Sequence, residues 1–107
     1  MRAFALSEKR VPSLLSVSNR SHRERDDNYR HVVARLNARW RVIECRDGIQ
    51  WIVQSSKKWG AGTRWESRGY CRTRQGLFSF CTRLVGDISS DAKAVLASLP
   101  EWMEVRR

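Results

Sequence analysis

An Asp-Gly pair, Asp47-Gly48, stands between two short runs of β-branched and aromatic residues that together span 40–54. Asp-Gly is a preferred sequence for the type I′ turn of a β-hairpin, because both central residues of that turn have positive φ. A two-residue loop also determines how the two strands pair. The predicted cross-strand partners are Ile43 with Ile52 and Val42 with Val53. Both faces of this hairpin are substantially apolar, which indicates a sheet that is covered, at least in part, on both sides.

The segment before the hairpin has the periodicity of an amphipathic helix. Ser21 and Glu24 have the spacing of a capping box, in which each side chain satisfies a free amide of the first turn. Four apolar residues then recur at the i, i+3, i+4 and i+7 spacing of one helical face. They are Tyr29, Val32, Val33 and Leu36. We therefore predict a helix over about 22–38.

A basic segment with interleaved aromatic residues follows the hairpin. Residues 55–62 predict a mobile basic loop with Trp59 at its tip, and residues 63–72 predict a third strand. Side chains alternate between the two faces of a strand. One predicted face carries Trp65, Ser67 and Cys71, and the other carries Arg64, Glu66, Arg68, Tyr70 and Arg72.

Two helices follow the third strand. Thr73 is a suitable N-cap for the first, which runs to about Val85, and the second begins near Ser90 and stops at Pro100. The side chains that we expect in the core are Leu77, Phe78, Cys81, Leu84 and Val85, then Ala92, Val95, Leu96 and Leu99, and finally Trp102 and Met103. The predicted fold class is α+β, with an N-terminal helix, a three-stranded antiparallel sheet and two C-terminal helices in the order α-β-β-β-α-α.

The net charge of +10 indicates an anionic partner. The chain has 21 Lys and Arg residues against 11 Asp and Glu, and nucleic acid is the usual partner of such a chain. The excess is concentrated in residues 39–84, which hold ten cations and three acids. Seventeen of the 21 cations are Arg, which grips phosphate bidentately and stacks on bases. A GC-rich coding sequence would also favour Arg, but it does not explain the net charge.

The candidate binding surface combines the third strand with the preceding loop. Cations interleaved with aromatic rings suit phosphate contact and base stacking. The candidate nucleic-acid-binding residues are Lys57, Lys58, Trp59, Arg64, Arg68, Tyr70 and Arg72. The alternative interpretation is a solvated outer strand, whose aliphatic stems cover the sheet while the guanidinium groups lie in water.

The chain carries no pattern typical of an enzyme or a metal site. It has three cysteines and two histidines, and neither a CxxC nor an HxxxH spacing occurs. They are Cys45, Cys71, Cys81, His22 and His31. The GxG at 60–62 lacks the strand-then-helix context of a nucleotide-binding fingerprint. We therefore expect no catalytic residue, no cofactor and no metal.

Length and hydropathy favour a single cytoplasmic domain. With 107 residues, we expect a flexible basic arm over 1–20 and one domain over 21–107. No apolar run approaches the roughly 18 residues that a membrane span needs, so no membrane partner is expected. Charged residues at 8–10 precede any secretory apolar region. An odd number of cysteines favours free thiols, which a reducing compartment maintains.

Two resemblances bear on function. The run from Arg39 to Ile52, with the later 70–74, resembles a group of small bacterial proteins of unassigned activity that are associated with plasmids, prophages and other mobile elements; the similarity spans about 28–102. The group has no assigned activity, so it implies no functional residues.

A second resemblance is to the arm-type DNA-binding domain of phage integrases. It rests on three antiparallel strands followed by a helix, with the aromatic-x-x-Thr-Arg junction at 70–74. Those domains lay their sheet in the major groove. The predicted N-terminal helix and the apolar hairpin faces depart from that architecture, and a helix over the sheet would prevent groove insertion.

Two hypotheses for function follow. The first is a nucleic-acid-binding module, for DNA more than RNA, that uses the candidate residues above. The second is a protein-binding factor of a mobile element without enzymatic activity, such as an inhibitor of a host defence system or an accessory protein. The salt dependence of binding separates them, because phosphate contacts weaken steeply as salt rises. The sequence carries no signal for an oligomeric state.

Overall fold

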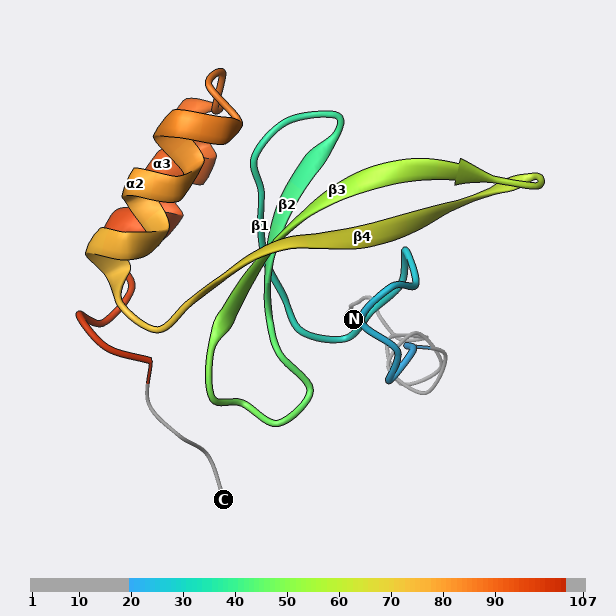
Figure 1. Cartoon of the computed structure of the whole chain (residues 1–107), viewed down its shortest axis with the longest axis horizontal. Coiled ribbons are helices and arrows are strands. Elements are labelled where there is room, and N and C mark those ends of the chain that lie inside the picture. Colours follow the sequence, from blue (N-terminus) through green and yellow to red (C-terminus); the bar gives the residue numbers. More distant parts are fainter. Residues whose placement is uncertain (1–19, 104–107) are drawn as a thin grey trace, which may run out of the picture.

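Residues 20–103, which the computed structural model describes, form a four-stranded antiparallel sheet followed by two helices (Figure 1). Each strand pairs with the next one along the chain. The elements are β1 (Val32–Arg35), β2 (Trp40–Glu44), β3 (Trp51–Trp59), β4 (Gly62–Cys71), α2 (Arg74–Leu84) and α3 (Ser90–Ala97). The predicted three-stranded sheet with an N-terminal helix is therefore wrong, although the fold is α+β. Apart from Arg20, the arm predicted for 1–20 lies outside the described residues.

Turns and the edge strand β1 replace the helix predicted over 22–38. The predicted capping box does not form, because the Ser21 hydroxyl accepts from the Arg23 amide at 2.9 Å and donates to the Asp26 carboxylate at 2.7 Å. β1 then pairs with β2, and Val32 lies opposite Ile43. β-Branched residues suit such a ladder. The spacing of apolar residues is compatible with a helix, but here the cross-strand partners determine the structure.

The predicted register of the central hairpin is confirmed. β2 and β3 pair Ile43 with Ile52 and Val42 with Val53. The connection is wider than a two-residue turn, because the Gly48 amide donates to the Cys45 carbonyl at 2.9 Å and the Cys45 amide donates to the Gln50 carbonyl at 2.9 Å. Gly48 has φ 70°, a conformation that glycine adopts without a steric clash.

A continuous ribbon of β3 and β4 replaces the mobile loop predicted for 55–62. Trp59 pairs with Gly62 across the two-residue turn Gly60-Ala61, and Gly60 has φ 60°. A positive φ at this position is what the primed hairpin turns require. The polar residues before Trp59 continue the strand because β4 supplies a residue opposite each of them.

A β-bulge at Arg68 divides β4. Val53 lies opposite Gly69, whereas the next residue, Gln54, lies opposite Ser67, so Arg68 is the extra residue. The alternation of side chains along β4 therefore changes phase at Arg68. Alternation from the sequence alone assumes an unbroken strand and does not anticipate this change.

Both faces of the inner sheet are covered, as predicted. On one face, α2 packs against β3 and β4, and α3 packs against β1. The core cluster between them includes Val42, Trp51, Val53, Leu77 and Leu96. The other face carries a second cluster, formed by Tyr29, Ile43, Cys45 and Ile52. Tyr29 comes from the turns over residues 21–31, which we call the N-terminal turns.

Both C-terminal helices form as predicted. The Thr73 and Ser89 hydroxyls accept from the amides of Gly76 and Ala92 at 3.0 and 3.1 Å. Each helix turns only a narrow stripe toward the sheet, so Leu84 and Val95, which the sequence places in the core, are exposed. Trp102, which follows α3 and is also predicted in the core, is exposed as well. Met103 packs against the core as predicted. The three cysteines are free.

Candidate nucleic-acid interface

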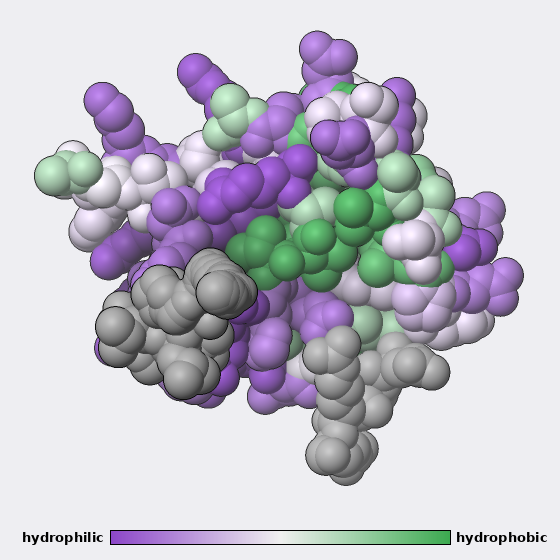
Figure 2. Space-filling view, turned by 180° about the vertical axis from the view of Figure 1, so that it is seen from behind, coloured by the Kyte–Doolittle hydropathy of each residue, from purple (hydrophilic) through white to green (hydrophobic). Residues whose placement is uncertain are grey.

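The outer parts of β3 and β4 project from the body of the molecule. We call residues 55–66 the ribbon. It points away from α2 and α3, which lie at the opposite end of the sheet (Figure 1). All residues from 57 to 63 are exposed. At a rise of about 3.3 Å per residue, the stretch from 55 to 59 is roughly 13 Å long. From behind, this end of the molecule shows mostly hydrophilic side chains, at the left of Figure 2, whereas apolar atoms gather near the middle of that view.

The strand register sorts the side chains of the ribbon onto its two faces. Residues directly opposite each other share a face, and Lys57 lies opposite Arg64. Trp59 is two residues beyond Lys57 and therefore projects from the same face. Lys58 lies opposite Thr63 and projects from the other face, on which Trp65 also lies. The ribbon thus presents cations on both of its faces.

Arg64 and Trp59 form a cation–π pair near the tip of the ribbon. The Arg64 guanidinium carbon lies 4.1 Å from the centroid of the Trp59 ring. Trp59 nevertheless remains 55% exposed. This pairing orients the two side chains relative to each other while a large part of the indole stays in contact with solvent.

One acid lies among the cations of this face. Glu66 is 3.5 Å from Lys57 Nζ and 3.7 Å from an Arg68 guanidinium nitrogen. The side chains of all three are about half exposed or more. Exposed ion pairs of this kind are worth about 0 to 1 kcal/mol, so a phosphate can replace Glu66 as their partner. We call Lys57, Trp59, Arg64 and Arg68 the basic face.

The other three candidate residues do not lie on the basic face. Because of the bulge, Tyr70 lies opposite Ile52, projects from the other side of the sheet and is 61% exposed. Arg72 follows the end of β4, where its carbonyl accepts from the Met103 amide at 2.8 Å. Lys58 occupies the opposite face of the ribbon. The predicted single face of Arg64, Arg68, Tyr70 and Arg72 is therefore wrong. Cys71, which the alternation places on the opposite face from these residues, lies on the same face as Arg64.

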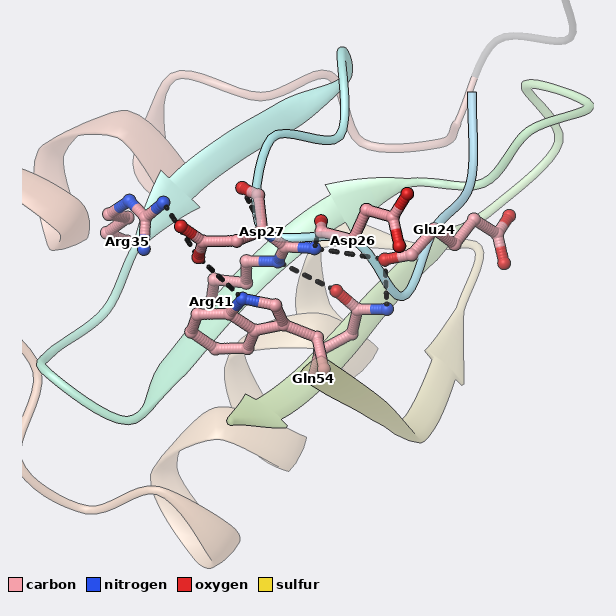
Figure 3. A network of polar contacts seen from close by, with 7 residues as sticks. Glu24, Asp26, Asp27, Arg35, Arg41 and Gln54 are labelled. Atoms are coloured by element: carbon pink, nitrogen blue, oxygen red, sulfur yellow. Dashed lines mark hydrogen bonds and ion pairs between the residues drawn. The ribbon is translucent and has the colours of Figure 1, made fainter. Parts of the chain in front are cut away.

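A buried arginine ties the N-terminal turns to the sheet below the ribbon (Figure 3). The side chain of Arg41 is fully buried. Its Nε donates to Gln54 Oε1 at 2.8 Å. Its terminal nitrogens donate to three backbone carbonyls at 2.9 to 3.1 Å, those of Glu24, Asp26 and Asp27.

The surroundings of Arg41 stabilise a cation that makes no direct ion pair with any residue from 20 to 103. Its guanidinium carbon lies 4.3 Å from the centroid of the Trp65 ring. The Asp27 carboxylate accepts from Trp65 Nε1 at 2.9 Å and lies 3.7 Å from an Arg35 guanidinium nitrogen. Burial, with a smaller contribution from the charge of Arg35, lowers the pKa of Arg41 to about 10. The carbonyls and the ring compensate for the lost hydration.

Sequence reasoning missed this network. A signal was present, because Arg41 is a charged residue between the apolar residues Trp40 and Val42. A charge at such a position needs several hydrogen-bond acceptors. In this fold, backbone carbonyls 14 to 17 residues away supply them.

Residues 20–103 lack two further features. Within that range, no group of three or more His, Cys, Asp or Glu side chains could hold a metal ion. No helix in the described part of the chain has the length and apolar character needed to cross a membrane.

Comparisons with models of protein families, with curated proteins and with solved structures gave no match to this chain.

Proposed function

We propose that this protein binds nucleic acid, duplex DNA in particular, by placing the ribbon in a groove. The observation that carries the proposal is the ribbon itself, an exposed two-stranded projection that bears cations on both faces and Trp59 near its tip. The net charge of +10 supports an anionic partner of this kind.

The dimensions of the ribbon fit a groove of duplex DNA. Its strands lie about 4.8 Å apart, and the major groove, about 12 Å wide, admits a two-stranded β-ribbon. The covering layers stop short of residues 57–63, so this part reaches the duplex without displacing the helices or the N-terminal turns. Insertion of the ribbon, rather than of the whole sheet face, is therefore the arrangement that we propose.

The distribution of charge suits the two walls of a groove. A ribbon whose tip points to the groove floor turns one face to each phosphate backbone. Lys57 and Arg64 then face one backbone, and Lys58 faces the other. Contacts of this kind position a protein on DNA without reading its sequence. Trp59, held by Arg64, reaches the bases first and can stack on them or wedge between them.

The cellular setting is also part of the proposal. We propose a cytoplasmic protein of a mobile element, with no catalytic activity. The three free cysteines support a reducing compartment. The resemblance of the 39–52 run to proteins of plasmids and prophages supports the setting in a mobile element.

The salt dependence of DNA binding tests the proposal with two variants of equal charge change. Lys57→Gln/Lys58→Gln removes two cations from the ribbon, and Arg83→Gln/Lys93→Gln removes two exposed cations from the helical end. Fluorescence anisotropy with a short mixed-sequence duplex, between about 50 and 200 mM salt, gives the slope of log affinity against log salt.

We expect the ribbon variant to flatten this slope by about 2, near 0.9 for each lost phosphate contact, and the control to leave it nearly unchanged. Equal slopes for the two variants would mean that the ribbon does not contact phosphates. A wild-type protein without measurable affinity at low salt would overturn nucleic-acid binding as a class.

A protein partner is the second candidate function. The observation that favours it is the exposure of apolar side chains at the helical end of the molecule, namely Leu84, Val95 and Trp102, which are 50, 38 and 65% exposed. Binding through such groups would change little with salt, because burial of apolar surface rather than release of counterions would drive it.

A further inference from the structure

A second basic feature lies at the base of the ribbon, on the face opposite the basic face. It is a pocket of about 370 Å³. The pocket is lined by Arg23, Glu24, Arg25, Arg46, Gln54, Trp65 and Ser67. These residues come from the N-terminal turns, the β2–β3 connection, β3 and β4. None belongs to the candidate residues that the sequence suggests.

Two hydrogen bonds, each donated by a backbone amide, fix the segments that carry the three arginines around this pocket. The Glu24 carboxylate accepts from the Arg46 amide at 2.6 Å, which ties the β2–β3 connection to the N-terminal turns. The Trp65 amide donates to the Arg25 carbonyl at 2.9 Å, which ties the same turns to the edge of β4. Arg23 and Arg25 flank Glu24 in the chain, so both contacts fix the same short segment.

The charges in the pocket are unbalanced. Three arginines line it together with one acid, Glu24. Among residues 20–103, none of the three guanidinium groups has an ion-pair partner. One oxygen of the Glu24 carboxylate is already engaged by the Arg46 amide. Like charges that converge on one cavity repel each other, and a bound anion relieves that repulsion.

The floor of the pocket adds polar groups that are held in place. Gln54 is 1% exposed, and its side-chain amide donates to the Glu24 carbonyl at 3.0 Å and to the Ser67 hydroxyl at 3.5 Å. The Ser67 oxygen thus accepts from Gln54, and its own hydrogen can be donated into the pocket. This hydroxyl donor adds to the affinity that the arginines give for phosphate oxygens.

We propose that this pocket binds a backbone phosphate of the nucleic acid that the ribbon engages. This inference rests on the proposed function and extends it to a second contact. Ser67 and Trp65 project from the same face as Lys58, so a strand that contacts Lys58 near the tip can continue to the pocket at the base. Three guanidinium forks can surround one phosphodiester and hold the strand in register.

Titration of the full chain with inorganic phosphate tests the pocket without nucleic acid. The probe is added at constant ionic strength against chloride, and NMR follows the Trp65 indole N–H, the Gln54 side-chain amide and, as a distant reference, the Trp102 indole N–H. We expect phosphate, and not chloride, to shift the Trp65 and Gln54 signals in a saturable way, with little change at Trp102.

Arg23→Gln/Arg25→Gln/Arg46→Gln should weaken phosphate binding by about tenfold or more, since each charge-assisted hydrogen bond contributes substantially to affinity. The matched control, Arg39→Gln/Arg83→Gln/Lys93→Gln, removes the same charge from exposed positions outside the pocket and should retain binding. Arg46→Lys keeps the charge and loses the planar fork, so we expect it to bind phosphate more weakly than the wild type.

Three results would overturn the inference. The first is the absence of a phosphate-specific shift, and the second is an equal loss of phosphate binding in the two triple variants. The third is that the pocket binds phosphate but the loss of its three arginines leaves the DNA affinity unchanged. The first two concern the pocket and leave the ribbon test unaffected. Conversely, phosphate binding by a protein that does not bind DNA would refute the proposed function and the assignment to a nucleic-acid backbone together.

Discussion

Arg41 provides long-range hydrogen-bond partners for a segment whose local pattern is helical. In a helix, the carbonyls of Glu24, Asp26 and Asp27 would each accept from an amide four residues further on. Here they accept from the Arg41 guanidinium. A buried cation without such acceptors would cost several kcal/mol. The turns that supply the acceptors are therefore favoured over a helix whose own hydrogen bonds are local.

Replacing Arg41 by Lys should destabilise the fold despite the retained charge. A lysine ammonium has three donors and no planar fork, so it cannot reach the Gln54 oxygen and all three carbonyls together. We expect a loss of about 2 to 4 kcal/mol in the free energy of unfolding, measured by urea titration. Arg39→Lys, at an exposed position, is the control and should change it by less than about 0.5 kcal/mol. Equal midpoints for the two variants would show that the network does not hold the N-terminal turns.

The Cys81 thiol should make stability depend on pH in the alkaline range. Burial, with a smaller contribution from Cys71, raises the pKa of Cys81 from 9.0 to about 12. The folded state therefore retains the thiol proton where the unfolded state loses it. The contribution of the protonated Cys81 thiol to the free energy of unfolding is therefore fully present below pH 9 and is lost as pH rises from 9 toward 12.

The free energy of unfolding should fall from about pH 9 upward by at most about 1.4 kcal/mol per pH unit through this group. Cys81→Ala should lower stability at pH 7, because it shortens a core side chain, yet flatten the dependence between pH 9 and 10. Urea midpoints at pH 7, 9 and 10 measure both effects. The same pH dependence in the variant and the wild type would exclude Cys81 as its source.

At the scale of elements, the sequence predicts those structures whose determinants are local. The β2–β3 register follows from the apolar pattern, because a slip by one residue would move Ile43 and Ile52 to the opposite face. The caps at Thr73 and Ser89 act within three residues, and both helices form. The N-terminal helix fails because distant partners decide that segment.

In the candidate interface, too, the sequence predicts what depends on local features and not what depends on distant partners. Lys57, Trp59 and Arg64 could be recognised from composition, and Trp59, which the sequence places at the tip of a loop, is exposed near the tip of the ribbon. Their arrangement on one face could not, because the bulge at Arg68 depends on how β4 pairs with β3. The pocket at the base of the ribbon could not be predicted either, since it joins turns, a hairpin connection and two strands.

Gly69 in β4 lies directly against the ring of Phe80 on α2. A Cβ at this position would overlap the ring of Phe80 on α2. Gly69→Ala should therefore cost about 1 to 3 kcal/mol of stability through overpacking. Gly62→Ala is the control, because its Cβ would meet only the Trp59 carbonyl oxygen at an ordinary distance of 3.8 Å.

A double-mutant cycle with Phe80→Ala isolates this contact. Once the ring is removed, Gly69→Ala should cost less than it does in the wild type, and the difference in urea-derived stabilities is the coupling energy. Equal costs in both backgrounds would place the origin of the effect in the strand backbone instead of the helix contact.

The whole molecule is polarised in shape. The helices cover one end of the sheet, and the ribbon projects from the other (Figure 1). The ribbon holds three cations and one acid. In the proposed orientation, these cations attract an anionic polymer to the projecting end of the molecule before any short-range contact forms.

Hydrogen exchange tests this orientation on the intact protein. Peptides that cover 55–66 should exchange more slowly when a saturating DNA duplex is added at low salt, because a groove excludes solvent from the ribbon amides. Peptides from α2 and α3 should exchange at the same rate with and without DNA. In the Lys57→Gln/Lys58→Gln variant, at the same DNA concentration, the ribbon should lose part of its protection, whereas Arg83→Gln/Lys93→Gln should keep it. Protection confined to α2 and α3 would place the DNA at the opposite end of the molecule and would contradict insertion of the ribbon.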